Sequence, residues 1–304
     1  MVRNVAPLFQ DLEDEDFYLL SGIEHGMRFS EWVDRRQLPK YANLNAEEVD
    51  YRLDRCLDFE LIQRQTIQYE GYQLLFEGYD ALALRALAER ESVTGVGAPI
   101  GEGKESDVLE VTDGDPMALK FHREGITNFR EVAREREYTA DRAHVSWLYT
   151  ARKAAEREYD MLQQMHTRAS VPAPYDHNRH ALLMERIDGV ELADAAVAPE
   201  NAMPMLRAIL DQLAIIYDVG YIHSDISEYN VVVSPAAIWI IDWPQATPID
   251  HPNAEELLER DVTNIVRYFE RKHPSLFDQS PDIRMLCEHI RQNSLRQWDP
   301  KDNK

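Results

Sequence analysis

Three polar residues in one short region of this sequence have the types and order that phosphoryl transfer requires. Asp225 stands five positions before Asn230, and Asp242 directly follows an apolar run that ends at Ile241. ATP-dependent enzymes use an Asp, an Asn and an Asp in this order to orient an attacking hydroxyl and to hold magnesium. Each residue alone could make a turn or a cap. Their joint order and spacing favour catalysis, with Asp225 orienting the nucleophile and with Asn230 and Asp242 binding the metal.

A lysine inside an apolar segment is the next candidate. Lys120 is centred in Met117-Ala118-Leu119-Lys120-Phe121, which predicts a strand. A buried charge needs a partner. On a predicted helix from Leu148 to Met165, Glu158 shares the inward side with Leu162, whereas Glu156 does not. We therefore expect Glu158 to pair with Lys120 and to hold it against the α- and β-phosphates. The alternatives are a surface lysine on an edge strand and an exposed helix glutamate.

A glycine-rich segment precedes this lysine, between two predicted strands. It reads Gly101-Glu102-Gly103-Lys104-Glu105-Ser106. Glycines let the backbone approach phosphates closely, and Ser106 replaces the third glycine of the usual pattern with a hydroxyl that can contact a phosphate. An ordinary glycine-rich turn is the alternative. The candidate nucleotide contacts here are Gly101, Gly103, Lys104 and Ser106.

Three further positions are expected to support such a site. Glu185 and Ile187 leave a predicted strand, as a connector whose backbone could bind adenine, although a simple strand end fits equally well. Asp261, on a later helix, could accept hydrogen bonds from the loop around Asp225, or could be a surface acid. His223 is expected to pack and hydrogen-bond within that loop rather than to act as an acid or base.

Hydrophobic periodicity divides the chain into parts of mixed α+β class. Residues 1–90 predict a winged helix-turn-helix, in which the helix before the hairpin would be the recognition helix. Residues 91–97 predict a linker, 98–186 an N-terminal lobe with a mobile loop at about 123–145, and 187–304 a C-terminal lobe with a polar tail. The elements expected in the first part are helices Phe9–Ile23, Phe29–Leu38, Ala46–Phe59 and Tyr79–Ala88 and strands Leu61–Tyr69 and Tyr72–Phe76.

The composition is that of a globular protein with an extreme net charge of −22. The acids are spread along the chain, which favours adaptation to a salt-rich cytosol over repulsion of nucleic acid. No apolar run reaches the roughly 20 residues of a membrane span, and no signal pattern is present. Cys56 and Cys287 lie too far apart for a disulfide framework or a zinc site, so a reducing cytoplasm is expected.

These motifs resemble the RIO family of atypical serine/threonine protein kinases, and specifically its second branch, which carries an N-terminal winged helix. The charge suggests a salt-adapted, prokaryotic or archaeal type of member. The matching segments are Gly101–Ser106, Ala118–His122, His223–Asn230, Ile240–Gln245 and Glu259–Asp261.

The resemblance implies a two-lobed kinase-like domain that binds ATP and Mg²⁺, with Mn²⁺ as an alternative ion. It implies that Asp225 is catalytic, that Asn230 and Asp242 bind metal, and that Asp242 is a transient phosphoryl acceptor. It further implies that Lys120 and Ser106 contact phosphates and that Glu185 and Ile187 contact adenine. The implied partner is the precursor of the small ribosomal subunit, with its rRNA and ribosomal proteins, docked through the winged helix. No membrane partner is implied, and the oligomeric state is left open.

Some features depart from the family pattern. Ser224 stands where a glycine is expected, Trp243 stands where phenylalanine is commoner, and no long activation segment follows Asp242. Residues 1–90 hold 10 Lys and Arg against 18 Asp and Glu, a net charge of −8. Docking on RNA therefore cannot rest on bulk charge. We expect it to use Arg52, Arg55 and Arg64, on the predicted recognition helix and wing.

Two other functions compete with this interpretation. A small-molecule kinase of the aminoglycoside or choline type shares a His-x-Asp and an Ile-Asp-Trp pattern, but not the winged helix or the Gly101–Ser106 segment. A non-catalytic RNA- or protein-binding assembly factor would keep the fold, but the intact set of Lys120, Asp225 and Asp242 argues against decay.

Overall fold

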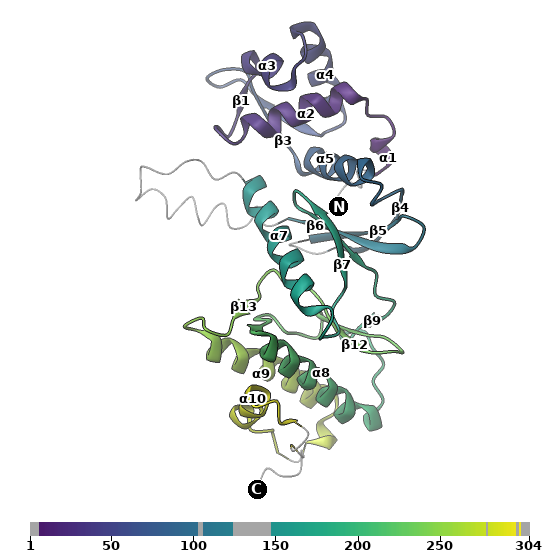
Figure 1. Cartoon of the computed structure of the whole chain (residues 1–304), viewed down its shortest axis with the longest axis vertical. Coiled ribbons are helices and arrows are strands. Elements are labelled where there is room, and N and C mark those ends of the chain that lie inside the picture. The colour runs from purple at the N-terminus through teal and green to yellow at the C-terminus, as the bar shows by residue number, and fades with distance from the viewer. Residues whose placement is uncertain (1–5, 103–105, 124–146, 278, 296–297, 299–304) are drawn as a thin grey trace. The chain divides into compact units, whose positions relative to one another are not determined.

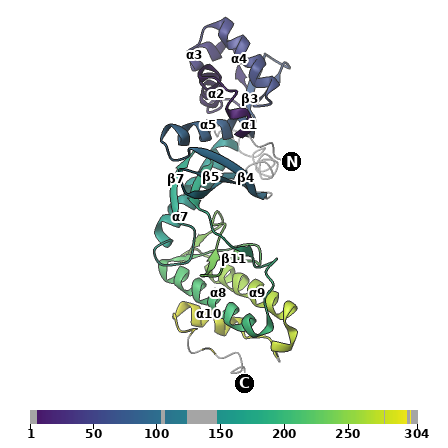
Figure 2. The ribbon, with the colours of Figure 1, turned by 90° about the vertical axis from the view of Figure 1, so that its right-hand side faces the viewer.

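The computed structural model of the chain describes residues 6–102, 106–123, 147–277, 279–295 and 298. It forms two compact units, shown from two sides in Figures 1 and 2. The N-terminal unit comprises Met1–Tyr159 with Tyr175–Met184, and the C-terminal unit comprises Asp160–Pro174 with Glu185–Lys304. Both units combine helices with small sheets, which confirms the α+β class. The predicted mobile loop at 123–145 lies, apart from Arg123, outside the described residues.

The first part of the N-terminal unit is a winged helix. Its three-stranded sheet has the order β1-β3-β2, and β2 and β3 form the predicted hairpin. Asn45 caps α4 by accepting a hydrogen bond from the Glu48 backbone N–H at 2.9 Å, as expected for a helix that starts at Ala46. The elements are α1 (Ala6–Phe9), α2 (Asp14–Gly26), β1 (Val33–Asp34), α3 (Leu38–Ala42), α4 (Ala46–Asp58), β2 (Ile62–Gln65), β3 (Gly71–Leu74) and α5 (Phe76–Glu89).

The helix predicted from Phe29 to Leu38 is wrong. Val33 and Asp34 instead form β1, which pairs with Tyr72 and Gly71 of β3. A short 3₁₀ turn follows, and α3 begins only at Leu38. Proline suits the first turn of a helix, because its missing N–H has no partner there in any case. Pro39 accordingly lies in the first turn of α3.

Two of the three arginines predicted to contact RNA are structural instead. Arg52 is only 6% exposed and donates to Glu48 at 2.6 Å and to Glu13 at 2.8 Å. Arg55 donates to the buried Asp16 at 3.0 Å. These arginines thus join α4 to α2 and its approach, which corrects their assignment as free contacts. Arg64 is different, because its side chain is 47% exposed and is paired with Glu70 on the wing.

A five-stranded sheet with the order β4-β5-β6-β8-β7 forms the second part of this unit. β4 begins at Gly95, within the segment predicted as a linker, because Gly95 already pairs with Thr112. The strands at the centre are antiparallel, with Val108 opposite Lys120 and Ser106 opposite His122. The elements are β4 (Gly95–Glu102), β5 (Ser106–Thr112), β6 (Pro116–His122), α7 (Trp147–Met165), β7 (Pro174–Asn178) and β8 (Ala181–Glu185).

Strand β6 is covered on both faces. Every residue from Met117 to His122 is buried, a pattern typical of a strand between two layers. Helix α5 of the winged helix lies beside this sheet in both views (Figures 1 and 2). One continuous core joins the two parts, since Leu20 and Leu82 belong to the same hydrophobic cluster as Leu119 and Leu183.

The C-terminal unit is built on helices α8, α9 and α10 with short strands around the segment that contains Asp225. β11 and β12 form an antiparallel hairpin, in a three-stranded sheet of order β12-β11-β9. Among the described residues, none of the helices combines the length and apolar composition that crossing a membrane requires. The elements are β9 (Val190–Glu191), α8 (Pro199–Val219), β10 (Tyr221–Ile222), β11 (Val231–Val233), β12 (Ile238–Ile240), β13 (Thr247–Pro248), α9 (Ala254–Lys272) and α10 (Ile283–Arg291).

Candidate active site

The end of α8 places the loop that carries Asp225. Gly220 ends this helix with a φ of 112°, a left-handed conformation that glycine adopts without strain. The chain then enters β10, which pairs with β13. Residues 223–230, which we call the catalytic loop, follow directly and lead into β11. The loop is therefore anchored at both ends by hydrogen-bonded strands.

Asp261 of α9 fixes the catalytic loop by hydrogen bonds to its backbone. Its carboxylate is buried and accepts hydrogen bonds from the backbone N–H groups of Ser224, at 2.7 Å, and Ile226, at 3.1 Å. This confirms the predicted contact between Asp261 and the loop. Burial raises the pKa of Asp261 to about 6, although the two N–H donors act in the opposite direction. The two bonds bracket Asp225 and so fix the backbone on both sides of it.

Ser224 occupies the strained position of the loop. Its φ of 67° lies in the left-handed region, which explains why a glycine is expected there. The Arg260 guanidinium donates to the Ser224 carbonyl, and Asp261 accepts from its N–H. A strained non-glycine residue persists only where its surroundings determine its conformation. Arg260 and Asp261 supply those surroundings, so the serine at this position is accommodated.

Asn230 and Asp242 are brought together by the β11–β12 hairpin. The Ile241 N–H donates to the Asn230 carbonyl at 3.0 Å, so Asp242 is the next residue after a direct partner of Asn230. The Asn230 side-chain amide donates to the Asp225 carbonyl at 2.8 Å, which directs its oxygen away from that carbonyl. Asp242 has a φ of 67°, a conformation that Asp tolerates better than most residues.

Asp225 and Asp242 lie close enough to affect each other. Burial and then the charge of Asp242 raise the pKa of Asp225 above its ordinary value. Repulsion between two carboxylates is relieved when a cation binds to them. Carboxylate and amide oxygens are the ligands that Mg²⁺ prefers, and one or two carboxylates suffice when phosphates complete the shell. The Asn230 and Asp242 side chains therefore fit a magnesium ion.

His223 and Trp243 support this half of the site. His223 is buried, and its Nε2 donates to the Ile241 carbonyl at 3.0 Å. Its ring lies 4.5 Å from the ring of Trp243, which is also buried and donates to the Ile240 carbonyl at 3.1 Å. The packing role predicted for His223 is confirmed. Trp243 packs against the His223 ring, and in this way the fold accommodates a residue larger than phenylalanine at position 243.

Lys120 and Glu158 form the ion pair that the sequence predicts. Lys120 Nζ lies 2.8 Å from each carboxylate oxygen of Glu158, and both side chains are buried. Glu156 lies elsewhere on the helix and pairs with the surface residue Lys153. His122 joins this pair without having been predicted, and its Nε2 is 2.9 Å from Glu158 Oε2. Its spacing, two residues after Lys120 on one strand, was the available signal.

Electrostatics favour an ionised Glu158. Burial alone would raise the pKa of Glu158, but the Lys120 charge and the hydrogen bond from His122 outweigh burial and lower it. The glutamate therefore stays charged at neutral pH and fixes the Lys120 ammonium in one position. A positioned ammonium on a central strand is suited to bind phosphate oxygens.

The remaining nucleotide candidates belong to several different strands and loops. Gly101 is in β4 opposite Val108, and Ser106 opens β5 on the same side as Lys120, whereas Gly103 and Lys104 lie outside the described residues. Glu185 ends β8, where its backbone N–H donates to the Ala173 carbonyl at 2.8 Å and its carboxylate accepts from the Ala173 N–H at 3.2 Å. Ile187 is half-buried in the loop that follows. Their nucleotide contacts stay predictions.

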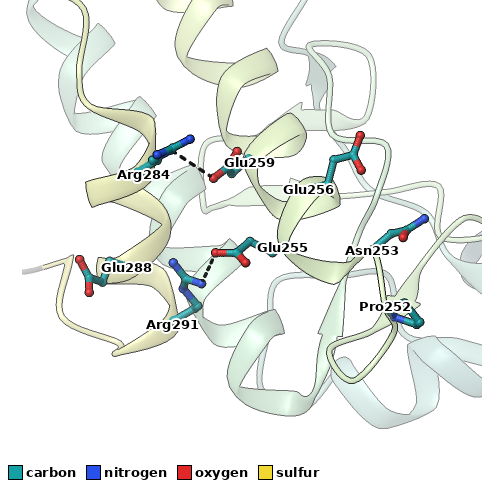
Figure 3. Close-up of a pocket in the computed structure, with 8 residues that line it drawn as sticks. All are labelled: Pro252, Asn253, Glu255, Glu256, Glu259, Arg284, Glu288 and Arg291. Carbon is teal, nitrogen blue, oxygen red and sulfur yellow. Dashed lines mark hydrogen bonds and ion pairs between the residues drawn. The ribbon is translucent and has the colours of Figure 1, made fainter.

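A cavity of about 550 Å³ lies elsewhere in the C-terminal unit, between α9 and α10 (Figure 3). Glu255 and Glu259 line it from one side of α9, and at 100° per residue Asp261 points to another side. Arg291 pairs with Glu255 at 3.0 Å, and Arg284 lies 3.8 Å from Glu259. None of the predicted site residues lines this cavity, so we assign it no part in the chemistry.

A strand lysine paired with a helix glutamate, together with an Asp–Asn–Asp set at a hairpin, defines a protein-kinase-like phosphotransferase. Residues 107–281 match the family described as the RIO domain, and residues 9–90 match the one described as Rio2, N-terminal. The chain therefore belongs to the RIO family of serine/threonine-protein kinases and carries the Rio2 N-terminal domain. This confirms the resemblance seen in the sequence.

Relatives and solved structures agree with this assignment. The chain is 37% identical over 271 residues to the RIO-type serine/threonine-protein kinase Rio2 of Methanocaldococcus jannaschii, covering 87% of this chain and 99% of that protein. It is 37% identical to the serine/threonine-protein kinase rio2 of Schizosaccharomyces pombe, covering 93% and 83%. The Rio2 kinase–ADP/Mg²⁺–phosphoaspartate complex from Chaetomium thermophilum matches with a TM-score of 0.76 and 30% identity, covering 95% of this chain and 91% of that one.

Proposed function

We propose that this chain is an ATP- and Mg²⁺-dependent serine/threonine kinase or ATPase. The observation that carries the proposal is the catalytic loop, in which Asp261 fixes the backbone around Asp225 while the hairpin sets Asn230 beside Asp242. The related kinase from Chaetomium thermophilum has been solved with ADP and Mg²⁺, which supports the same ligands here. Mn²⁺ has the same preference for oxygen ligands and is the alternative ion.

The side chains of the site then have distinct roles in the reaction. Lys120, held by Glu158, binds the α- and β-phosphates. Asn230 and Asp242 would hold Mg²⁺, which would neutralise negative charge on the phosphates. Asp225 accepts a hydrogen bond from the attacking hydroxyl or water and orients it. Asp225 is an exposed residue of the catalytic loop, so a nucleophile can reach it.

Asp242 is also the proposed transient phosphoryl acceptor. Its carboxylate oxygen would attack the γ-phosphorus while the bond to the β-phosphate oxygen breaks, which forms an acyl phosphate and releases ADP. Water then hydrolyses the acyl phosphate to inorganic phosphate and restores the carboxylate. The Chaetomium thermophilum kinase contains a phosphoaspartate, which supports this step.

The proposed setting is maturation of the small ribosomal subunit in the cytoplasm. The winged helix would dock on rRNA or ribosomal proteins of the precursor. Arg52 and Arg55 are occupied within the fold, so Arg64 on the wing and the exposed Arg36 are the better candidates for phosphate contacts. Two free, buried cysteines, Cys56 and Cys287, are consistent with a reducing compartment.

Turnover of radiolabelled ATP by purified protein tests the catalytic proposal. Asp225→Ala should abolish steady-state phosphate release while nucleotide binding stays measurable. Asp250→Asn is the matched control, since Asp250 is an exposed acid in the same unit and should leave turnover unchanged. Equal turnover by Asp225→Ala and wild type would refute the assigned role. Faster phosphorylation of an aminoglycoside or choline than of protein would instead identify a small-molecule kinase.

Binding to the precursor particle tests the second part of the proposal. The winged helix should be needed for co-sedimentation with purified small-subunit precursors, and added precursor should change the rate of ATP turnover. If a Lys120→Ala, Asp242→Ala double variant still co-sediments and also supports subunit maturation in cells, the chain acts as a non-catalytic assembly factor.

A further inference from the structure

A buried cluster of charges joins the winged helix to the sheet that carries Lys120. The Arg123 guanidinium binds Asp80 of α5 in a bidentate manner, at 2.5 and 2.7 Å. Its Nε donates to Asp107 of β5 at 2.6 Å. All three side chains are less than a tenth exposed. The last helix of the winged helix is thus connected to β5 through a single arginine.

His180 completes the cluster without adding a charge. Its Nε2 donates to Asp80 at 2.7 Å, and its ring stacks on Tyr79 of α5 at 4.3 Å. Burial lowers the pKa of His180 to about 4, so the imidazole is neutral at pH 7. The cluster then holds two carboxylates against one guanidinium. Asp107 Oδ1 is buried and, within the described part of the chain, has no hydrogen-bond partner.

Such an arrangement is a poor means of stabilising a fold. A buried ion pair often contributes little net stability, and a buried polar atom without a partner is unfavourable. An excess negative charge and an unpaired carboxylate oxygen both lie next to Arg123. A role in positioning accounts for the cluster better than a role in stability does.

The cluster and the nucleotide candidates lie on opposite faces of the same two strands. Residues alternate between the faces of a strand, and directly paired residues share a face. Lys120, His122 and Ser106 belong to the face that meets Glu158. Asp107 and Arg123 follow Ser106 and His122 directly and belong to the other face, which meets Asp80. A displacement of Arg123 would therefore also move the strand ends that present Ser106 and His122.

We propose that Asp80, Arg123 and Asp107 couple the winged helix to nucleotide binding. Asp80 and Arg123 are positioning residues, which set the ends of β5 and β6 from the face opposite Lys120. Since coupling between two sites is reciprocal, a partner that shifts α5 on docking changes nucleotide affinity, and nucleotide changes affinity for that partner. This inference rests on the proposed binding of ATP.

Calorimetric titration with a non-hydrolysable ATP analogue and Mg²⁺ tests the inference. Asp80→Asn removes the carboxylate charge that faces Arg123 and keeps the size of the side chain. We expect the Kd of this variant for the analogue to rise about five- to tenfold. The matched control is Glu24→Gln. Glu24 of α2 pairs with Arg179 at 2.8 Å and so also joins the winged helix to the sheet, but neither residue belongs to β5 or β6. Its Kd should equal that of wild type.

The experiment is done well below the unfolding temperature of each variant, so that folding and affinity are separated. If Asp80→Asn lowers the unfolding temperature but binds the analogue as wild type does, the cluster is only structural and the inference is wrong. If wild type itself binds no nucleotide, the proposed function fails and the inference with it. Should Asp80→Asn not fold, hydrogen exchange of wild type decides. The analogue must slow exchange in α5 around Asp80, and unchanged exchange there overturns the coupling.

Discussion

Replacing Lys120 by methionine should destabilise the protein strongly, because it leaves a buried carboxylate without its main partner. The Lys120 and Glu158 side chains are 4% and 1% exposed, and their charged atoms are 2.8 Å apart. Removing one partner of a buried ion pair costs about 3–5 kcal/mol. We expect the free energy of unfolding of Lys120→Met to fall by this amount at pH 7, measured by urea denaturation.

A second substitution should reverse most of this loss. In Lys120→Met, Glu158→Gln, the buried charge is gone and the amide can still hydrogen-bond to His122. We expect this double variant to be more stable than Lys120→Met by about 2 kcal/mol or more. Binding of Mg²⁺·ATP should stay lost in both, since the ammonium is absent. Lys153→Met is the control, because Lys153 pairs with Glu156 on the surface and its replacement should leave the stability close to that of wild type.

The pH dependence gives the reasoning a further test. In wild type the pKa of Glu158 is below its ordinary value of 4.5, so this group adds stability above pH 4.5 and loses it as the pH falls further. Without Lys120 the glutamate takes up a proton more readily, and the deficit of Lys120→Met should shrink toward pH 4. Two results would refute the role of the pair. Lys120→Met could be as stable as Lys153→Met, or adding Glu158→Gln to Lys120→Met could restore no stability.

Three other predictions concern residues around the site and in the winged helix. In Asp261→Asn the side chain can accept from only one of the two loop N–H groups, so ATP turnover should fall about 10- to 100-fold. Wild-type turnover should also fall as the pH drops through about 6, where Asp261 takes up a proton. A pH-independent rate would contradict this. The pKa of His180 is about 4 in the folded protein and 6.5 in the unfolded chain. The free energy of unfolding should therefore fall by about 3 kcal/mol as the pH drops from 6.5 to 4. His180→Gln should reduce this pH dependence, measured by urea denaturation. Arg52→Ala should lower the free energy of unfolding by about 3 kcal/mol, because it removes a partner of the buried Asp16. Arg64→Ala should change it by at most about 0.5 kcal/mol and should weaken RNA binding in a filter assay. If Arg52→Ala weakened RNA binding more than Arg64→Ala and left stability unchanged, Arg52 would be an RNA contact after all.

The parts of the site that the sequence could predict rest on local periodicity and on chemical order. Glu158 shares a helix side with Leu162 and Met165, and that side is buried, so its inward direction followed from spacing alone. Asp225, Asn230 and Asp242 were identifiable because their order reflects a reaction rather than a fold. Asn45 and Glu48 marked the start of α4, because a cap is a contact between near neighbours.

The parts that could not be predicted depend on residues far apart in the chain. β1 exists because Val33 pairs with Tyr72, and nothing local to Val33 announces that partner. Arg52 has the type and position of an exposed recognition-helix residue, but Asp16, 36 positions earlier, is buried against it. Arg123 likewise finds Asp80 across 43 positions. Isolated charges on an acidic chain favour a surface interpretation, and only the folded arrangement shows which of them are enclosed.

The central proposal is that Lys120 and Asp242 serve one reaction. Steady-state ATP turnover by Lys120→Met, by Asp242→Asn and by the double variant tests it most directly, since residues that act as a unit have strongly non-additive effects. Each single variant should lose nearly all turnover, and the double variant should be no worse than the slower single one. Turnover near the wild-type rate in either single variant, or losses that multiply in the double variant, would contradict the account.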